Sequence, residues 1–373
     1  MARKQFLSFL LIFSLLISCA SALAEADDDD DWDDDVDDAW EMEHPLHSGD
    51  YAYALLDDGT VEITSYGGAD TEIVIPDTLD GKPVTAIGER AFYYSLSLTS
   101  VTIPDSVTHI SQKAFSCCFQ LTSITLPSGL TAIESGTFDL CKSLTTIDIP
   151  DSVAAIADDA FIGCKALQSF TLSPNHPYFF LADDALCRTA DSTLLLYPNA
   201  REPRTYRIPD GITAISAYAF YDCDLLESVV VPDSVTQLPA RAFSGCSALA
   251  SVSLPDSLTE IGTAAFSGCS ALTGIRIPAA ITEIINHTFS GCTSLATLEI
   301  PDSVTKTGDY AFFGCTSLTS IAIPDSVTAI GNGAFSNCTA LTLTVTPDSY
   351  AAEYAKANNI PCTYPDANDW LNN

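Results

Sequence analysis

The amino-acid sequence predicts a repeat solenoid, rich in β-structure, in which short coils of equal length stack in register. A proline, a phenylalanine and a cysteine each recur every 23 residues, with one interruption between Pro150 and Pro209. Fixed periods of this size are typical of solenoids, so a chain of 373 residues can form one continuous array. Ten coils are expected from the recurring phenylalanines, which are Phe92, Phe115, Phe138, Phe161, Phe220, Phe243, Phe266, Phe289, Phe312 and Phe335.

The apolar residues within one period predict a short strand followed by turns. Leu318, Ile321 and Ile323 can point inward from a strand, and the Pro-Asp-Ser sequence after them is typical of a turn. Ala334 and Phe335 should close the coil with a helical or 3₁₀ turn. This spacing, at a period of about 20 to 29 residues, is that of a leucine-rich repeat. Stacked coils would place strands about 4.8 Å apart and bury each phenylalanine against the next.

The unit IPDSVTAIGNGAFSNCTALT resembles the BspA-like leucine-rich repeat of bacterial surface proteins, over about residues 50–365. The resemblance implies a right-handed coil array over residues 87–346, with a cap at each end. Residues 48–86 resemble the family's N-terminal β-hairpin cap and the start of the first repeat, and residues 347–373 its C-terminal helical cap and tail. Independently of the resemblance, Ser349 can cap a helix that ends near Asn358.

The interruption adds 36 residues to one period. Two strand-like runs around a turn predict a hairpin insert at about residues 174–208. Three arginines at the end of this insert form a local basic spot on an acidic chain, and they are candidate contacts for a partner. Pairing with the solenoid's own carboxylates is the alternative. These arginines are Arg201, Arg204 and Arg207.

The N-terminus predicts export. Residues 1–24 have two basic residues followed by an apolar run of 12, which is too short to span a bilayer. Cleavage after Ala24 would release a soluble protein, whereas a bacterial lipobox would end at Cys19 and make that residue a lipid anchor. Residues 25–47 are expected to be an acidic, disordered linker. The protein is therefore expected outside the cytoplasm, secreted or lipid-anchored at the bacterial cell surface, without a transmembrane segment.

The charge and the scarcity of catalytic motifs exclude several functions. A net charge of −34 disfavours nucleic acid and anionic membranes as partners. The five histidines lack metal-binding or catalytic spacing, and no serine lies in a G-x-S-x-G sequence. No enzyme activity and no cofactor are expected, although the many carboxylates could bind calcium weakly.

Cysteines occupy one phase of nine coils, and the first coil has Ser95 there. A thiol at an inner bend behaves as a small apolar side chain, so buried free thiols are expected, with size more important than bonding. Disulfides between neighbouring coils remain an alternative in an oxidising compartment. Metal binding is the third interpretation. It is disfavoured because zinc needs ligands that converge on one point, and a line of sulfurs does not converge. The cysteines are Cys118, Cys141, Cys164, Cys223, Cys246, Cys269, Cys292, Cys315 and Cys338.

Binding is the function class that the sequence favours. The exposed strand positions are mostly small and hydroxylic, and they lack the aromatic and arginine anchors typical of interfaces. Variation concentrates in the two residues before each Ala-Phe or Thr-Phe, where a solvated convex surface is the simplest interpretation. Nearby aromatic residues are the candidate partner contacts: Tyr93, Tyr94, Tyr218, Tyr221, Tyr310 and Phe313.

The resemblance implies an adhesin-like role. We expect an exported, monomeric protein that binds an extracellular protein or another cell-surface macromolecule. The alternative is a passive structural coat whose acidic surface binds calcium weakly.

Overall fold

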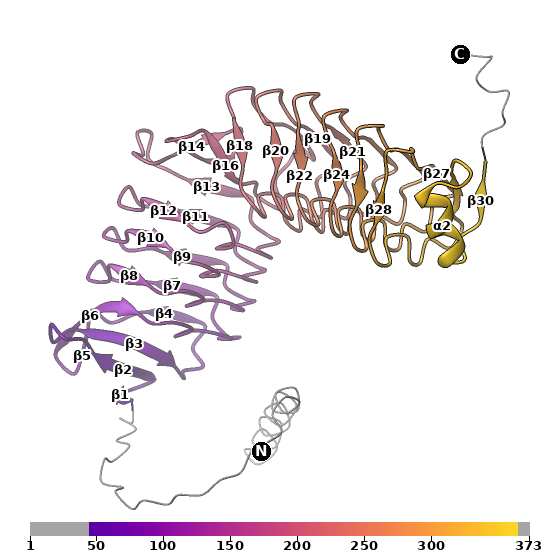
Figure 1. Cartoon of the computed structure of the whole chain (residues 1–373). Helices are drawn as coiled ribbons and strands as arrows, with labels where there is room; N and C mark the ends of the chain where they lie inside the picture. The colour runs from indigo at the N-terminus through magenta and orange to yellow at the C-terminus, as the bar shows by residue number, and fades with distance from the viewer. Residues whose placement is uncertain (1–44, 365–373) are drawn as a thin grey trace, which may run out of the picture. The chain divides into compact units, whose positions relative to one another are not determined.

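The computed structural model describes residues 45–364 of the chain. These residues form a β-solenoid of stacked coils, which confirms the fold class predicted from the sequence (Figure 1). The predicted export signal, Cys19, most of the predicted acidic linker and the end of the C-terminal tail lie outside the described residues.

The described residues begin with strands that pair partly antiparallel. A hairpin turn joins two of them, because Gly59 has a φ of +82° and the carboxylate of Asp58 accepts hydrogen bonds from Thr60. The second strand of this hairpin pairs in parallel with a strand of the first coil, so the hairpin covers the edge of the stack. The strands are β1 (Leu46–Ser48), β2 (Tyr51–Leu55), β3 (Val61–Tyr66), β4 (Glu72–Val74), β5 (Thr78–Leu79) and β6 (Lys82–Ile87).

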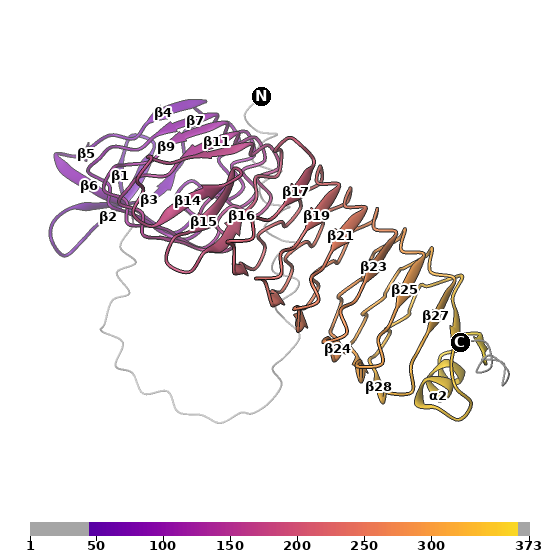
Figure 2. The same ribbon diagram turned by 90° about the horizontal axis from the view of Figure 1, so that it is seen from above.

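Three-residue strands, here called the face strands, lie side by side along one side of the coils (Figure 2). Paired members are parallel and in register, as Val229 of one coil is with Val252 of the next. The middle residue points into the core, and the outer two point away from it. Beyond β4, the face strands are β7 (Ser100–Thr102), β9 (Ser123–Thr125), β11 (Thr146–Asp148), β13 (Ser169–Thr171), β17 (Thr205–Arg207), β19 (Ser228–Val230), β21 (Ser251–Ser253), β23 (Gly274–Arg276), β25 (Thr297–Glu299), β27 (Ser320–Ala322) and β29 (Thr342–Thr344).

A second set of two-residue strands, here called the return strands, carries the chain back in each coil. They also pair in parallel, and most bury their second residue. The return strands are β8 (His109–Ile110), β10 (Ala132–Ile133), β12 (Ala155–Ile156), β18 (Ala214–Ile215), β20 (Gln237–Leu238), β22 (Glu260–Ile261), β24 (Glu283–Ile284), β26 (Lys306–Thr307) and β28 (Ala329–Ile330).

The phenylalanines stack through the core in two runs, Phe92 to Phe161 and Phe220 to Phe335, so the predicted stack is confirmed within each run and interrupted at the insert. Neighbouring rings such as Phe243 and Phe266 are parallel within 2°, with centroids 5.5 Å apart. Tyr66 stacks on Phe92 and Tyr197 on Phe220, so a tyrosine begins each run, whereas Tyr354 meets the last phenylalanine edge to face. The insert is therefore a modified coil, because its Tyr197 fills the position of a phenylalanine and bonds to the next coil through its backbone N–H.

The closing segment of each coil differs from the sequence prediction, because it forms successive turns and not a helical or 3₁₀ turn. Backbone N–H groups alternate between two acceptors. The N–H of Phe220 bonds to Ala242 in the next coil, whereas that of Tyr221 bonds three residues back to Tyr218. A helix would need every N–H for local bonds. Stacking the coils diverts half of these donors to the neighbouring coil.

The insert and the C-terminus complete the fold. β14 (Phe179–Ala182), β15 (Ala185–Arg188) and β16 (Thr193–Leu196) form an antiparallel meander, which joins the return strands through β18. At the end, Ser349 caps α2 (Tyr350–Ala357) by accepting a hydrogen bond from Ala352, and β30 (Cys362–Thr363) pairs with β29. The helix ends at Ala357, with Asn358 as its C-cap, close to the predicted end.

All nine predicted positions of the cysteine column lie against the core, and eight are fully buried. Each thiol donates to the carbonyl oxygen of the stacked aromatic residue in the preceding coil, as Cys269 does to Phe243 at 3.1 Å. The sequence prediction, which rested on the size of the side chain, did not include this hydrogen bond. The thiol satisfies a second lone pair of a buried carbonyl that already accepts one N–H, so bonding as well as volume favours cysteine.

Candidate functional site

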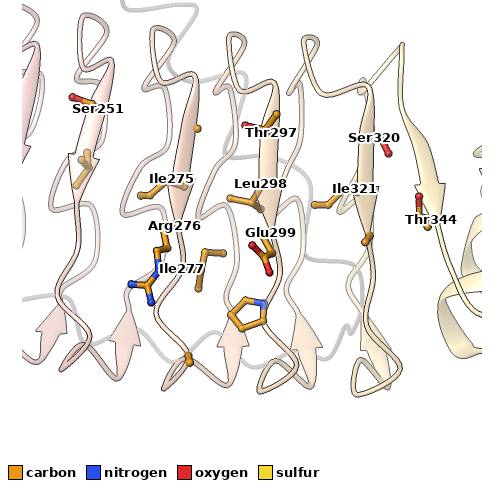
Figure 3. A pocket seen from close by; sticks show the side chains of 15 residues that line it. Ser251, Ile275, Arg276, Ile277, Thr297, Leu298, Glu299, Ser320, Ile321 and Thr344 are labelled. Atoms are coloured by element: carbon orange, nitrogen blue, oxygen red, sulfur yellow. The ribbon is translucent and has the colours of Figure 1, made fainter. Parts of the chain in front are cut away.

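A hollow lies on the outer side of the face strands, across β21, β23, β25, β27 and β29. Its volume is about 820 Å³ and it is open to solvent (Figure 3). Gly274 occupies a position that carries serine or threonine in the neighbouring face strands, and the missing side chain leaves a gap beside Thr297. The floor is apolar, because the inward residues Ile275 and Leu298 remain slightly exposed.

Opposite charges stand at one end of this hollow. Arg276 and Glu299 are register partners on adjacent strands, and both are exposed (Figure 3). The guanidinium of Arg276 also lies 2.5 Å from the carboxylate of Asp256, and this contact raises the pKa of Arg276. Arg276 lines a second hollow of about 600 Å³ as well, so it stands where the two hollows meet.

Sequence reasoning missed Gly274 and Arg276 as members of a site. Both depart from the small hydroxylic pattern of the face strands in one and the same coil. Two departures in one coil could have indicated a site from the sequence. Whether they form a hollow depends on how the neighbouring strands surround the missing side chain.

The three arginines of the insert all pair with carboxylates, which was the alternative interpretation of this basic spot. Arg201 is 11% exposed; it bonds to Asp184 at 3.0 Å, and its guanidinium lies over the rings of Tyr197 and Tyr206. Arg204 contacts two glutamates, and Arg207 contacts Asp210 at 3.2 Å. Arg201 thus contributes to the core of the insert, while the other two remain accessible.

The aromatic candidates near the start of the solenoid form one cluster. Tyr93 and Tyr94 are 48% and 52% exposed, and their rings contact each other at 5.6 Å. Tyr94 also meets the edge of Phe119, over which the ammonium of Lys142 lies at 4.7 Å. Phe119 and Lys142 were not predicted as members of this cluster.

The remaining aromatic candidates form two pairs farther along the chain. Tyr218 contacts Tyr221 at 5.7 Å, and Tyr310 contacts Phe313 at 5.9 Å, both edge to face. The structure therefore does not bring the six aromatic candidates into a single site.

Burial raises the pKa of Cys118 and of Cys292 to about 12, so these thiols stay protonated at neutral pH. Within residues 45–364, no group of three or more histidine, cysteine, aspartate or glutamate side chains could hold a metal ion. Over the same residues, no helix has the length and apolar character needed to cross a membrane.

The fold and this open site define a leucine-rich-repeat solenoid with an exposed strand face. The family model described as BspA type leucine rich repeat region matches residues 71–181 and 213–342. The chain belongs to this BspA-type family.

Several solved structures are similar to this chain. A leucine rich cell surface protein from Faecalibacterium prausnitzii is 30% identical, covering 88% of this chain and 97% of that one, with a TM-score of 0.49. A leucine-rich repeat protein from Eubacterium ventriosum is 24% identical over 78% of this chain and 93% of its own, with a TM-score of 0.60. The pneumococcal vaccine antigen PcpA is 16% identical over 87% and 99%, with a TM-score of 0.55. No curated protein matches the chain.

Proposed function

We propose that this chain is an exported bacterial surface protein that binds an extracellular protein or another cell-surface macromolecule, without catalysis, through its face strands. The hollow at Gly274 carries this proposal. It is open, spans five strands, and places Arg276 and Glu299 beside an apolar floor. An open, shallow surface of mixed polarity suits a macromolecule, whereas small molecules usually bind in more enclosed pockets.

Family membership and the N-terminal sequence support the location. BspA-type repeats occur in bacterial surface proteins, and the Faecalibacterium relative is named as a cell surface protein. The export signal at residues 1–24 agrees with that location. Mass spectrometry of the mature N-terminus distinguishes the two anchoring hypotheses, because acylated Cys19 indicates a lipid anchor and free Glu25 indicates a secreted protein.

The binding test uses immobilised extracellular matrix proteins and mucins with the full mature chain. Gly274→Gln fills the hollow and Arg276→Glu reverses its charge, and each should weaken binding by about tenfold or more if the hollow is central to the interface. Ser123→Gln is the matched control, because it changes the same strand position in β9, far along the ladder. No binding by the wild-type protein, or an equal loss in the control, would contradict the proposal.

A further inference from the structure

Two columns of residues on the closing turns have a left-handed backbone. The first column lies two residues before the recurring phenylalanine in nine coils, and the second lies two residues after it in ten coils. The first column comprises Arg90, Lys113, Gly136, Tyr218, Arg241, Ala264, His287, Tyr310 and Gly333. The second column comprises Tyr94, Cys117, Leu140, Gly163, Asp222, Gly245, Gly268, Gly291, Gly314 and Asn337.

The residue types of the two columns differ, although the backbone is the same. Glycine, asparagine and aspartate tolerate left-handed φ best, and they fill seven of ten positions in the second column. In the first column glycine fills two of nine positions, and arginine, lysine, tyrosine and histidine fill six. Glycine at two positions shows that the fold accepts it there. Bulky residues are thus present where they strain the backbone, which points to a function for their side chains.

Contacts between coils hold these side chains in place. The guanidinium of Arg241 lies 5.8 Å from the ring centroid of Tyr218 and donates to its hydroxyl at 3.1 Å. The ring of His287 stacks on that of Tyr310, with centroids 5.3 Å apart and planes within 15°. The side chains therefore present a defined surface.

Two aromatic corners bound this surface. Tyr218 with Tyr221, and Tyr310 with Phe313, occupy equivalent places four periods of 23 residues apart. At the usual spacing of parallel strands the corners are about 19 Å apart, the length of about six extended residues. We call the whole the corner surface; its members are Tyr218, Tyr221, Arg241, His287, Tyr310 and Phe313.

Arg241 differs from the other arginines of the described residues. Six of the seven, all except Arg241, have a carboxylate oxygen within 4.0 Å. In a chain of net charge −34, an exposed arginine that is held by a tyrosine and not by a carboxylate is exceptional. Its position between two aromatic corners gives the surface the tyrosine and arginine content of interface hot spots.

We propose that the corner surface docks an extended polypeptide segment, with a carboxylate opposite Arg241 and apolar side chains at the two corners. A peptide fits better than a glycan, because Arg241 covers a face of Tyr218 and His287 covers a face of Tyr310. Stacked sugars need open ring faces, whereas ring edges, hydroxyls and a guanidinium suit peptide groups. This site is separate from the face strands, so it goes beyond the function proposed above.

The test is a selection of random peptides displayed on phage against the full mature chain, followed by affinity measurement with the synthetic peptides. We expect enriched sequences with a central aspartate or glutamate flanked by apolar residues. Their binding should weaken by about tenfold or more in Arg241→Gly and in Tyr310→Gly. Replacing the peptide's carboxylate by the corresponding amide should have a similar effect in wild type and none in Arg241→Gly.

Two controls separate a docking role from a structural one. Ala264→Gly changes the same column without removing a contact side chain, and should leave peptide binding unchanged. Glycine relaxes the left-handed backbone, so Arg241→Gly should keep the Tm of the wild type while losing the peptide. Three outcomes would overturn the proposal. The selection could enrich no acidic peptide, Arg241→Gly could leave the binding of the enriched peptides unchanged, or the protein could bind polygalacturonate in place of peptides. Arg276→Glu should not affect these peptides, so failure here is distinguishable from failure at the face strands.

Discussion

The cysteine column and the first left-handed column lie five residues apart in the same coils, yet they differ in almost every respect. One residue type fills nine coils of the cysteine column, whereas the first column has six residue types in nine coils. Eight of the nine thiols are buried, and each of the nine bonds to the coil before it, as Cys246 and Cys269 do. Most bulky side chains of the first column reach solvent.

The difference shows where this solenoid is free to vary. A residue at an interior position has the same neighbours in every coil, so the same residue type recurs there. A position at the surface meets solvent, so the fold restricts only its backbone and leaves the side chain to function. The second column lies between these extremes, because its backbone favours glycine although an added Cβ would have room at Gly268, Gly291 and Gly314.

The largest expected effect is at the cysteine column, where high pH should lower the free energy of unfolding. Burial raises the pKa of Cys118 and Cys292 to about 12, above the ordinary value of 9.0 that applies in the unfolded chain. The stabilisation is therefore complete below the unfolded pKa and is lost as pH rises toward the folded pKa, by about 1.4 kcal/mol per pH unit for each thiol. Urea unfolding at about pH 8 and about pH 10 measures this loss. Equal urea midpoints at the two pH values would contradict this prediction. The double variant Cys118→Ala with Cys292→Ala should depend less on pH than the wild type.

A β-branched side chain in the second column should have the next largest effect. Gly268 has a φ of +76°, and a Cβ there would meet only ordinary contacts. Gly268→Val should lower the free energy of unfolding by about 2 kcal/mol or more, because valine is strained in that conformation. Thermal unfolding measures the change. Ser267→Val, one residue earlier, is the control, and an equal loss there would show that space and not φ is limiting.

Replacement of one thiol should have a moderate effect. Cys269→Ala removes the bond to the carbonyl of Phe243 and should cost about 1 kcal/mol. Cys269→Ser keeps a donor and should cost less, whereas equal losses would show that volume alone matters. Cys338→Ala should cost less than Cys269→Ala, because Cys338 is half-buried at the end of the column. Chemical denaturation of the three variants gives the comparison.

Changes in the first column should have the smallest effect on stability. Tyr310→Gly relieves a φ of 54° but loses the contact with His287, so the free energy of unfolding should change by no more than about 0.5 kcal/mol. Chemical denaturation against Ala264→Gly tests this. A loss of about 2 kcal/mol or more would show that Tyr310 is needed for stability. The first column would then be restricted by the fold, as the cysteine column is.

Much of this molecule follows from its period. The recurrence of Pro, Phe and Cys predicted the stacked phenylalanines, the buried thiols and the interruption. Ser349 as a cap residue predicted the α2 helix, independently of the period. The sequence prediction failed for the closing turns, since a helical turn and a succession of turns need the same local residues. It also missed that Tyr197 of the insert begins the second run of stacked rings by packing on Phe220.

The candidate sites needed the tertiary structure. Gly274 becomes a hollow only because neighbouring strands carry side chains on both sides, and Arg241 becomes exceptional only when the partners of every other described arginine are known. The period by itself determined which residues face the core, because each coil must bury the same stripe against the next. Where a side chain meets the coil above or below, and so what it leaves free for a partner, was decided only when the coils stacked.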